Sequence, residues 1–214
     1  MESIINHDEC FGFDASFGMC FLGDYTFCIR TGNFLQINRF KDRAIDQLGM
    51  INGELTGFSS MAGDPLNHIL AYADRIKNPQ IHFTDINGNE TGLLTIHDVV
   101  GIKSMKFSYD GQWLYALGGL PSFRLSAIDM KEKNVAYSQV FDHPIGENIS
   151  VCPTKPRLFA IFGDSQLNFP RLPFGLPEDR PNHLTFFTLL GTSSHYSFSK
   201  IVSVVPDPVI SICW

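Results

Sequence analysis

The segment IKSMKFSYDGQWLYALGGLPSFRLSAID, residues 102–129, alternates apolar stretches with two tight turns. The first turn, SYDG, contains Asp110-Gly111, a dipeptide that favours a β-hairpin. The stretch that follows is apolar on both faces, as expected for a strand packed between two layers. A GGLP bend and a charged KEK sequence separate two further stretches. The segment therefore predicts a four-stranded unit with strands at residues 102–107, 113–117, 123–129 and 135–141.

The same arrangement of strand, turn and strand recurs along the chain. It is found in GFSSMAGDPLNHILAYA (57–73) and in NISVCPTKPRLFAIFG (148–163). We place the turns at Met61, Phe107 and Cys152, which are 46 and 45 residues apart, and a fainter copy places Phe21 another 40 residues earlier. Periods of about 40 to 50 residues are typical of β-propeller blades.

We therefore predict an all-β propeller portion with about four four-stranded blades and the first strand of a fifth. The second blade is expected to open with a strand at 56–61, and the fourth to resume at 184–190 after an insertion. Residues 209–214 resemble the opening strand of a further blade, so we expect an incomplete propeller that belongs to a longer polypeptide. The predicted divisions are an N-terminal segment at 1–18, blades at about 19–49, 50–97, 98–144 and 145–200, and the start of the next at 201–214.

Composition and charge argue against several classes of protein. Of the 214 residues, 44% are hydrophobic and only 18% are charged, which favours a folded chain. The net charge of −6 and the absence of a basic run give nucleic acid no general reason to bind. The five cysteines contain no CxxC pair, and we interpret them as reduced and intracellular. No signal peptide and no membrane-spanning apolar run is recognised, so we expect no membrane partner.

The segment FSYDGQWLYALGGLPSFRLSAIDM resembles the WD-repeat family in its FSxDG turn and in a third strand that ends in aspartate. Ile128-Asp129 and Thr84-Asp85 stand where that family usually has Trp-Asp. The succession CFLGDYTFCIRTGNFLQIN, LAYADRIKNPQIHFTDI and SMKFSYDGQWLYALGGLPSFRLSAID is similar to the N-terminal propeller of the cilia- and flagella-associated WD-repeat proteins. The resemblance covers about residues 19–169, and its most specific pieces are ADRIKNPQI and GGLPSFRL.

This resemblance implies a WD40-like fold and a structural role. Such a protein is a scaffold of the motile cilium or flagellum axoneme, part of the cytoskeleton in the cytoplasm. Its implied partners are a sister WD-repeat protein, inner-arm dynein and subunits associated with the doublet microtubule. It also implies that His97, just before the third blade, takes the place of a histidine that hydrogen-bonds within a blade.

A search for catalytic motifs finds none. The sequence lacks GxSxG, HExxH, Walker-type and GxGxxG patterns, and its seven histidines are scattered. Asp85, Asp110 and Asp129 each stand at a turn or a strand end, where a carboxylate caps backbone N–H groups. Gly111 is interpreted as a turn residue with positive φ. We therefore predict no enzyme activity, no catalytic residue, no cofactor and no metal, and we assign structural turn roles to Asp85, His97, Asp110, Gly111 and Asp129.

The insertion PRLPFGLPEDRP, residues 170–181, is the segment that the repeat leaves unexplained. Its four prolines cannot form an interior strand. Phe174, Leu176 and Arg180 are residue types enriched at protein interfaces, so the insertion is a candidate partner-binding loop. A loop that packs over its own blade is the equal alternative.

Two other functions remain open on the sequence. A generic cytosolic WD-repeat adaptor would share every feature except the two specific hairpins. A propeller lactonase or hydrolase would need acidic residues and histidines on the innermost strands, and the corresponding segments Ser-Ser-Met, Met-Lys-Phe and Ser-Val-Cys are poor in both.

Overall fold

The structure, a computed structural model, describes residues 18–31, 34–52, 60–74, 77–119, 123–142, 145–146, 148–164, 182–192 and 195–204. These residues form strands and turns, and no helix occurs among them. Consequently, the described part of the chain contains no helix of the length and apolarity needed to cross a membrane.

The strands form four antiparallel sheets, each built from four strands that are consecutive in sequence. The first sheet contains β1 (Met19–Gly23), β2 (Thr26–Thr31), β3 (Phe34–Lys41) and β4 (Ala44–Asn52), and the second contains β5 (Met61–Asp64), β6 (Ile69–Asp74), β7 (Gln80–Thr84) and β8 (Glu90–Thr95). The third contains β9 (Ile102–Phe107), β10 (Trp113–Gly118), β11 (Phe123–Asp129) and β12 (Asn134–Phe141), and the fourth contains β13 (Asn148–Val151), β14 (Leu158–Asp164), β15 (Asn182–Thr192) and β16 (His195–Val204).

One irregularity recurs at the same place in all four sheets. The pairing between the third and fourth strands shifts register once, and a shift of this kind marks a β-bulge, which bends the outer strand. It occurs at the equivalent residue pair each time: Ile37/Asn38, Phe83/Thr84, Ala127/Ile128 and Phe186/Phe187. The sheets are therefore copies of one structural unit down to the position of a single bulge.

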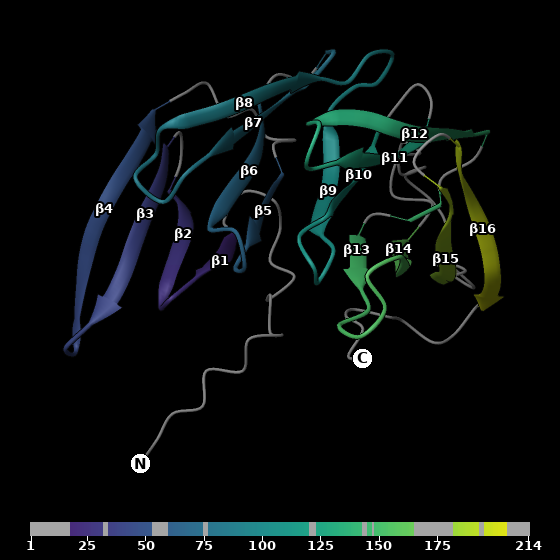
Figure 1. The fold of residues 1–214 in the computed structure, drawn as a ribbon. Helices are drawn as coiled ribbons and strands as arrows, with labels where there is room; N and C mark the ends of the chain where they lie inside the picture. The colour runs from purple at the N-terminus through teal and green to yellow at the C-terminus, as the bar shows by residue number, and fades with distance from the viewer. Residues whose placement is uncertain are drawn as a thin grey trace, which may run out of the picture.

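The sheets radiate from their innermost strands like the blades of a propeller (Figure 1). Strand β1 lies beside β5, β5 beside β9, and β9 beside β13. The outer strands trace an arc from β4 on the left through β8 and β12 to β16 on the right. Within the described residues the first and fourth sheets stand at opposite ends of this arc, so the ring is open.

Each junction between neighbouring sheets is filled by its own apolar cluster. Cys28 and Ile37 meet Leu70 and Tyr72 between the first two sheets. Corresponding clusters fill the junction between the second and third sheets and that between the third and fourth. Strand β10 contributes to two clusters and is buried along all six residues. Burial on both faces explains its uninterrupted apolar sequence.

Hydrogen bonds and a charged side chain also cross the junctions. The Ile149 N–H donates to Ser104 Oγ at 3.1 Å, which joins β13 to β9. Lys133 Nζ, from the β11–β12 turn, donates to Thr91 Oγ1 at 3.2 Å and lies 5.7 Å from the centre of the Phe83 ring. Gly92 makes room for it, because a Cβ there would lie 2.7 Å from Lys133 Cδ. The β11–β12 turn of the third sheet thus binds the outer strand β8 of the second sheet through Lys133.

The prediction of an all-β fold built from four-stranded units is confirmed, and the third sheet has its strands almost where the sequence placed them. Two details differ. Met61 begins β5 instead of ending the strand expected at 56–61, and the hairpin closes at Asp64, whose carboxylate caps the following turn. Strand β16 was not predicted, and it takes residues 201–204 into the fourth sheet. Residues 209–214 lie outside the described residues.

Candidate protein-interaction surface

The turns of the inner hairpins lie at one end of the sheets and touch one another. In the β1–β2 turn, Gly23 has a φ of +84°, and a Cβ there would lie 2.9 Å from the His68 ring. His68 belongs to the next inner turn, β5–β6, and its Nδ1 donates to the Leu22 carbonyl oxygen at 2.7 Å. Because a carbonyl oxygen can only accept, this contact fixes the proton on Nδ1. The first two turns are thereby joined.

A buried carboxylate organises the second turn and supports the third. Asp64 accepts hydrogen bonds from the N–H of Leu66 at 2.9 Å, the N–H of Asn67 at 3.2 Å and Asn67 Nδ2 at 2.7 Å. Gly111 of the β9–β10 turn has a φ of +67° and packs directly on this group, since a Cβ there would lie 2.6 Å from Asp64 Oδ2. Only glycine meets both requirements without displacing the turn.

The third turn is held by the SYDG sequence itself. Ser108 Oγ donates to Asp110 Oδ1 at 2.6 Å and accepts from the Trp113 N–H at 2.9 Å. The N–H of Gln112 donates to Asp110 Oδ1 at 3.1 Å. With Ser108 and Asp110 turned inward to these bonds, the intervening Tyr109 side chain projects into solvent.

Each of the three turns presents one large apolar side chain at its tip. Tyr25 is 75% exposed, Leu66 57% and Tyr109 63%. We name these three residues the turn rim. Tyrosine and leucine lose solvent contact favourably on association, and tyrosine is among the residues enriched at interface hot spots. A large exposed apolar group on each of three adjacent turns is the feature of this surface that internal packing does not explain.

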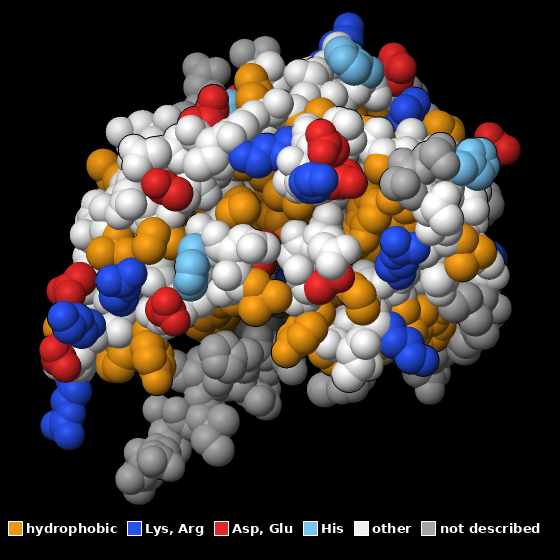
Figure 2. All heavy atoms as spheres, in the orientation of Figure 1, with side chains coloured by type: hydrophobic (Ala, Val, Ile, Leu, Met, Phe, Trp, Pro, Cys, Tyr) orange, Lys and Arg blue, Asp and Glu red, His pale blue; other side chains and the backbone are white. Residues whose placement is uncertain are grey.

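Charged turns of the outer hairpins surround the turn rim at the same end of the sheets. Lys41, Asp42 and Arg43 are exposed between β3 and β4, and Lys131 and Glu132 between β11 and β12. Figure 2 looks onto this end and shows hydrophobic groups interspersed with Lys, Arg, Asp and Glu side chains. The apolar turn rim is thus bordered by side chains of both charge signs. Protein interfaces commonly have this composition, with apolar residues at the core and polar residues around them.

Two of the outer turns are capped by aspartates. Asp129 Oδ1 accepts from the N–H groups of Lys131 at 2.8 Å and Glu132 at 3.3 Å. Asp85 Oδ1 accepts from the N–H groups of Asn87 at 2.8 Å and Asn89 at 2.9 Å. Partial burial opposes ionisation of Asp85, but the hydrogen bonds from Asn89 and Asn87 outweigh it and lower its pKa.

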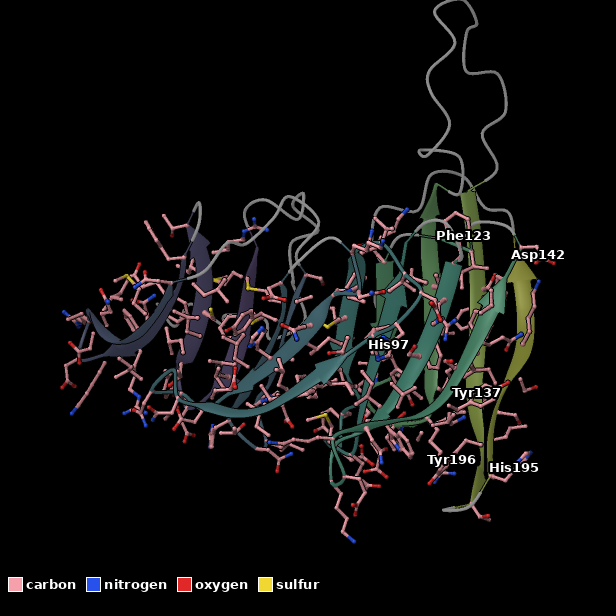
Figure 3. The ribbon with its side chains drawn as sticks, turned by 90° about the horizontal axis from the view of Figure 1, so that it is seen from above. His97, Phe123, Tyr137, Asp142, His195 and Tyr196 are labelled. Atoms are coloured by element: carbon pink, nitrogen blue, oxygen red, sulfur yellow. The ribbon has the colours of Figure 1, made fainter. Side chains whose placement is uncertain are left out.

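The structure gathers four of the five predicted turn residues at this end: Asp85, Asp110, Gly111 and Asp129. His97 lies in a turn at the opposite end, between β8 and β9, with its side chain exposed. Figure 3 shows it apart from Tyr137 and Tyr196. Within the described residues its ring makes no hydrogen bond, so the bond implied for it is not found there.

Three residues of the insertion are predicted to bind a partner. Phe174, Leu176 and Arg180 lie outside the described residues. Asp164 and Asn182, the described residues on either side of that segment, pair with each other at the end of the sheets away from the turn rim. Among the residues that the structure does describe, no group of three or more His, Cys, Asp or Glu is arranged to hold a metal ion.

Sequence reasoning missed the turn rim because it searched turns for Gly, Pro and Asp and not for exposed apolar residues. A usable signal was present. Tyr25, Leu66 and Tyr109 recur at intervals of 41 and 43 residues, close to the blade period, each beside a turn-forming residue.

Comparison with known proteins identifies the fold of the chain but does not assign the chain to a family. No family model matches the sequence, and no curated protein matches it. The fold matches 566 chains of solved structures. One is a WD40 propeller in the crystal structure of the mitotic checkpoint complex, with a TM-score of 0.50 and 14% identity over 85% of this chain and 63% of that chain. The chain thus spans 63% of that neighbour's length, and its fold is a WD40-like β-propeller in which the described blades leave the ring open.

Proposed function

We propose that this chain is a non-enzymatic scaffold that binds other proteins through the turn rim, and that it works in the axoneme of motile cilia or flagella. The observation that carries the first part is the placement of Tyr25, Leu66 and Tyr109 on three turns that lock together. Their backbones are fixed by the contacts of Gly23 with His68 and of Gly111 with Asp64. A surface whose tips are already ordered loses little conformational entropy on binding.

The chemistry of the rim favours a protein partner. Exposed side chains of both charge signs surround the apolar tips, and the whole chain carries a net charge of −6. Nucleic acid would be repelled at long range by that net charge. A partner protein with an apolar patch and interspersed charges fits the rim without leaving a buried charge unpaired.

The axonemal part of the proposal is supported by the sequence resemblance. The hairpin ADRIKNPQI and the bend GGLPSFRL are the most specific pieces of the chain's resemblance to the cilia- and flagella-associated WD-repeat proteins. On that basis the proposed partners are a sister WD-repeat protein, inner-arm dynein and subunits bound to the doublet microtubule. A cytosolic adaptor would use the same rim with soluble partners.

The test is to express the tagged full chain in ciliated cells and to extract the cells with detergent. The proposal expects the chain to remain with the axoneme. The triple variant Tyr25→Asn, Leu66→Ser and Tyr109→Ser should move to the soluble fraction while melting at an unchanged temperature. Asparagine is chosen at position 25 because the backbone there has a φ of +58°, which asparagine tolerates.

A matched control replaces three apolar residues that are exposed on outer strands, away from the rim: Met50→Ser, Leu93→Ser and Val140→Thr. This control should stay with the axoneme. A soluble wild-type chain would point to the cytosolic adaptor, and equal retention of the rim variant and the control would remove the rim from the interface.

A further inference from the structure

The fourth inner turn differs in charge from the other three. The first three contain no lysine or arginine, and each has an aspartate in it or beside it: Asp24, Asp64 and Asp110. The fourth turn, CPTKPR at residues 152–157, joins β13 to β14 and contains no acidic residue. Its Lys155 and Arg157 are both exposed, and we name them the basic pair. Positive charge therefore gathers at the fourth turn, at the end of the sheets that carries the turn rim.

A cysteine stands in this turn where the second turn has a carboxylate. By register, Cys152 corresponds to Asp64, since each directly follows the last pair of its inner hairpin ladder that precedes the turn. Asp64 accepts hydrogen bonds from the N–H groups two and three residues further on, and Cys152 accepts them from Thr154 and Lys155. Burial opposes ionisation of the Cys152 thiol, but the hydrogen bonds from Thr154 and Lys155 and the charge of Lys155 lower its pKa. The fourth turn thus favours negative charge.

Arg157 is held in one orientation by three contacts. Its Nη1 donates to the Gly191 carbonyl oxygen at 2.9 Å. The guanidinium lies 5.8 Å from the centre of the Trp113 ring and 5.9 Å from that of Tyr196. A guanidinium has five N–H donors, and the bond to Gly191 uses one. No Asp or Glu among the residues that the structure describes forms an ion pair with Arg157 or Lys155. Donors of the basic pair therefore remain for a partner.

The basic pair continues the turn rim. The Tyr115 hydroxyl of the third sheet donates to the Pro156 carbonyl oxygen at 3.0 Å, which fixes the fourth turn beside the sheet that carries Tyr109. Figure 2 shows Lys and Arg side chains over the fourth sheet, next to hydrophobic ones. At the other end of the rim, the side chain of Asp24 is 81% exposed. The rim therefore runs from an acidic first turn to a basic fourth turn.

We propose, on the basis that the turn rim is the interface of the proposed function, that the basic pair binds an acidic segment of the partner protein. Asp or Glu carboxylates of this segment lie over the fourth turn, and its apolar side chains cover the rim. An arginine already oriented by stacking offers a carboxylate two parallel N–H donors at little entropic cost. A single arginine with one lysine suits a carboxylate, whereas phosphate groups are bound by clusters of arginine. Repulsion from Asp24 keeps the acidic part of the segment away from the first turn.

The test measures binding of fluorescein-labelled peptides to the purified chain by fluorescence anisotropy. One peptide alternates glutamate with leucine and tyrosine, and its counterpart has glutamine in place of glutamate. The glutamate peptide should bind about tenfold more tightly, because its hydrogen bonds to the basic pair are charge-assisted. Lys155→Gln with Arg157→Gln should remove this preference, and Arg157→Lys should reduce it, since lysine lacks the planar pair of donors. The matched control, Arg43→Gln with Lys131→Gln on the outer turns, should preserve it.

Three results would overturn the inference: equal binding of the two peptides to the wild type, an unchanged preference in the basic-pair variant, or tight binding of a phosphoserine counterpart without binding of the glutamate peptide. Circular dichroism melting checks the folding of each variant. Lys155→Glu, which should also reduce the preference, replaces the double variant if loss of the Arg157 contacts unfolds the chain.

The rim variant Tyr25→Asn, Leu66→Ser and Tyr109→Ser separates this inference from the proposed function. It should bind both peptides more weakly to the same degree and keep the preference for glutamate. Unchanged binding of both peptides by the rim variant would overturn the proposed function and this inference with it. A missing preference for glutamate, with the rim still required for binding, would overturn this inference alone.

Discussion

Tyr115 and Phe159 stack across the junction between the third and fourth sheets, with ring centroids 4.2 Å apart. The Tyr115 hydroxyl donates a hydrogen bond to the Pro156 carbonyl oxygen at 3.0 Å. One side chain thus supplies apolar packing within the junction and a hydrogen bond to the inner turn of the next blade. Burial raises the pKa of Tyr115 well above its ordinary value, which keeps the hydroxyl in the donor form.

Replacing Tyr115 by Phe should cost about 1 kcal/mol of unfolding free energy, since the ring stack remains and only the hydrogen bond to Pro156 is lost. Urea denaturation followed by circular dichroism measures this. Tyr109→Phe, at the exposed tip of the third turn, is the control and should change stability by less than about 0.5 kcal/mol. Equal effects of the two variants would contradict the role given to the hydroxyl.

Gly111→Ala should destabilise the chain more than Gly88→Ala does. Both glycines have positive φ, so both substitutions carry the backbone penalty of about 1 kcal/mol or more. A Cβ at Gly88 would meet its nearest atom at 3.5 Å, in ordinary contact, whereas at Gly111 it would press on the Asp64 carboxylate. The difference between the two melting temperatures therefore isolates the packing of the third turn on the second. No difference would mean that the turns do not interlock.

Leu117→Ala should cost about 2 to 5 kcal/mol, because Leu117 is fully buried in the cluster between the third and fourth sheets. Leu93→Ala removes the same atoms from an exposed position on β8 and should cost less than about 0.5 kcal/mol. Denaturant melts of the two variants make the comparison. Similar losses would show that the junction is not a packed core.

Alkaline pH should weaken the junction between the first and second sheets. Burial raises the pKa of Tyr72 to about 12, and the charges of Glu90 and Asp74 add to this effect. The unfolded chain releases the same proton at a pH of about 10. Stability is therefore complete below about pH 10 and falls as the pH rises toward 12. Tyr72→Phe keeps the stack on His82 and should make the decline shallower in denaturation measured across this range.

The fold was predictable where both faces of a strand are buried. The apolar run Trp113–Gly118, between the SYDG turn and the GGLP bend, has no other reasonable location than between two sheets. Strand β16 was missed because HYSFSK alternates small polar residues with aromatics on a half-exposed outer strand. The end of β5 was misplaced because the residue that closes its hairpin, Asp64, is a buried carboxylate in a position where apolar residues were expected.

Local sequence around each turn predicts only the supports of the candidate surface, and the turn rim shows only in the recurrence of its three residues at nearly the blade period. Asp85, Asp110, Gly111 and Asp129 are turn-forming residues that local sequence identifies. The turn rim depends on three turns from separate blades meeting at one end, and that proximity comes from the stacking of the sheets. The residues next to Tyr25 in sequence therefore give no sign that the three turns lie close together.

The most direct test of the scaffold assignment is hydrogen–deuterium exchange of the chain alone and within the assembly recovered from ciliated cells through its tag. Binding through the turn rim predicts slower amide exchange at residues 24–25, 65–67 and 109–112, with the outer strands β8 and β12 unchanged. Unchanged exchange at all three turns, together with protection elsewhere on the chain, would contradict it.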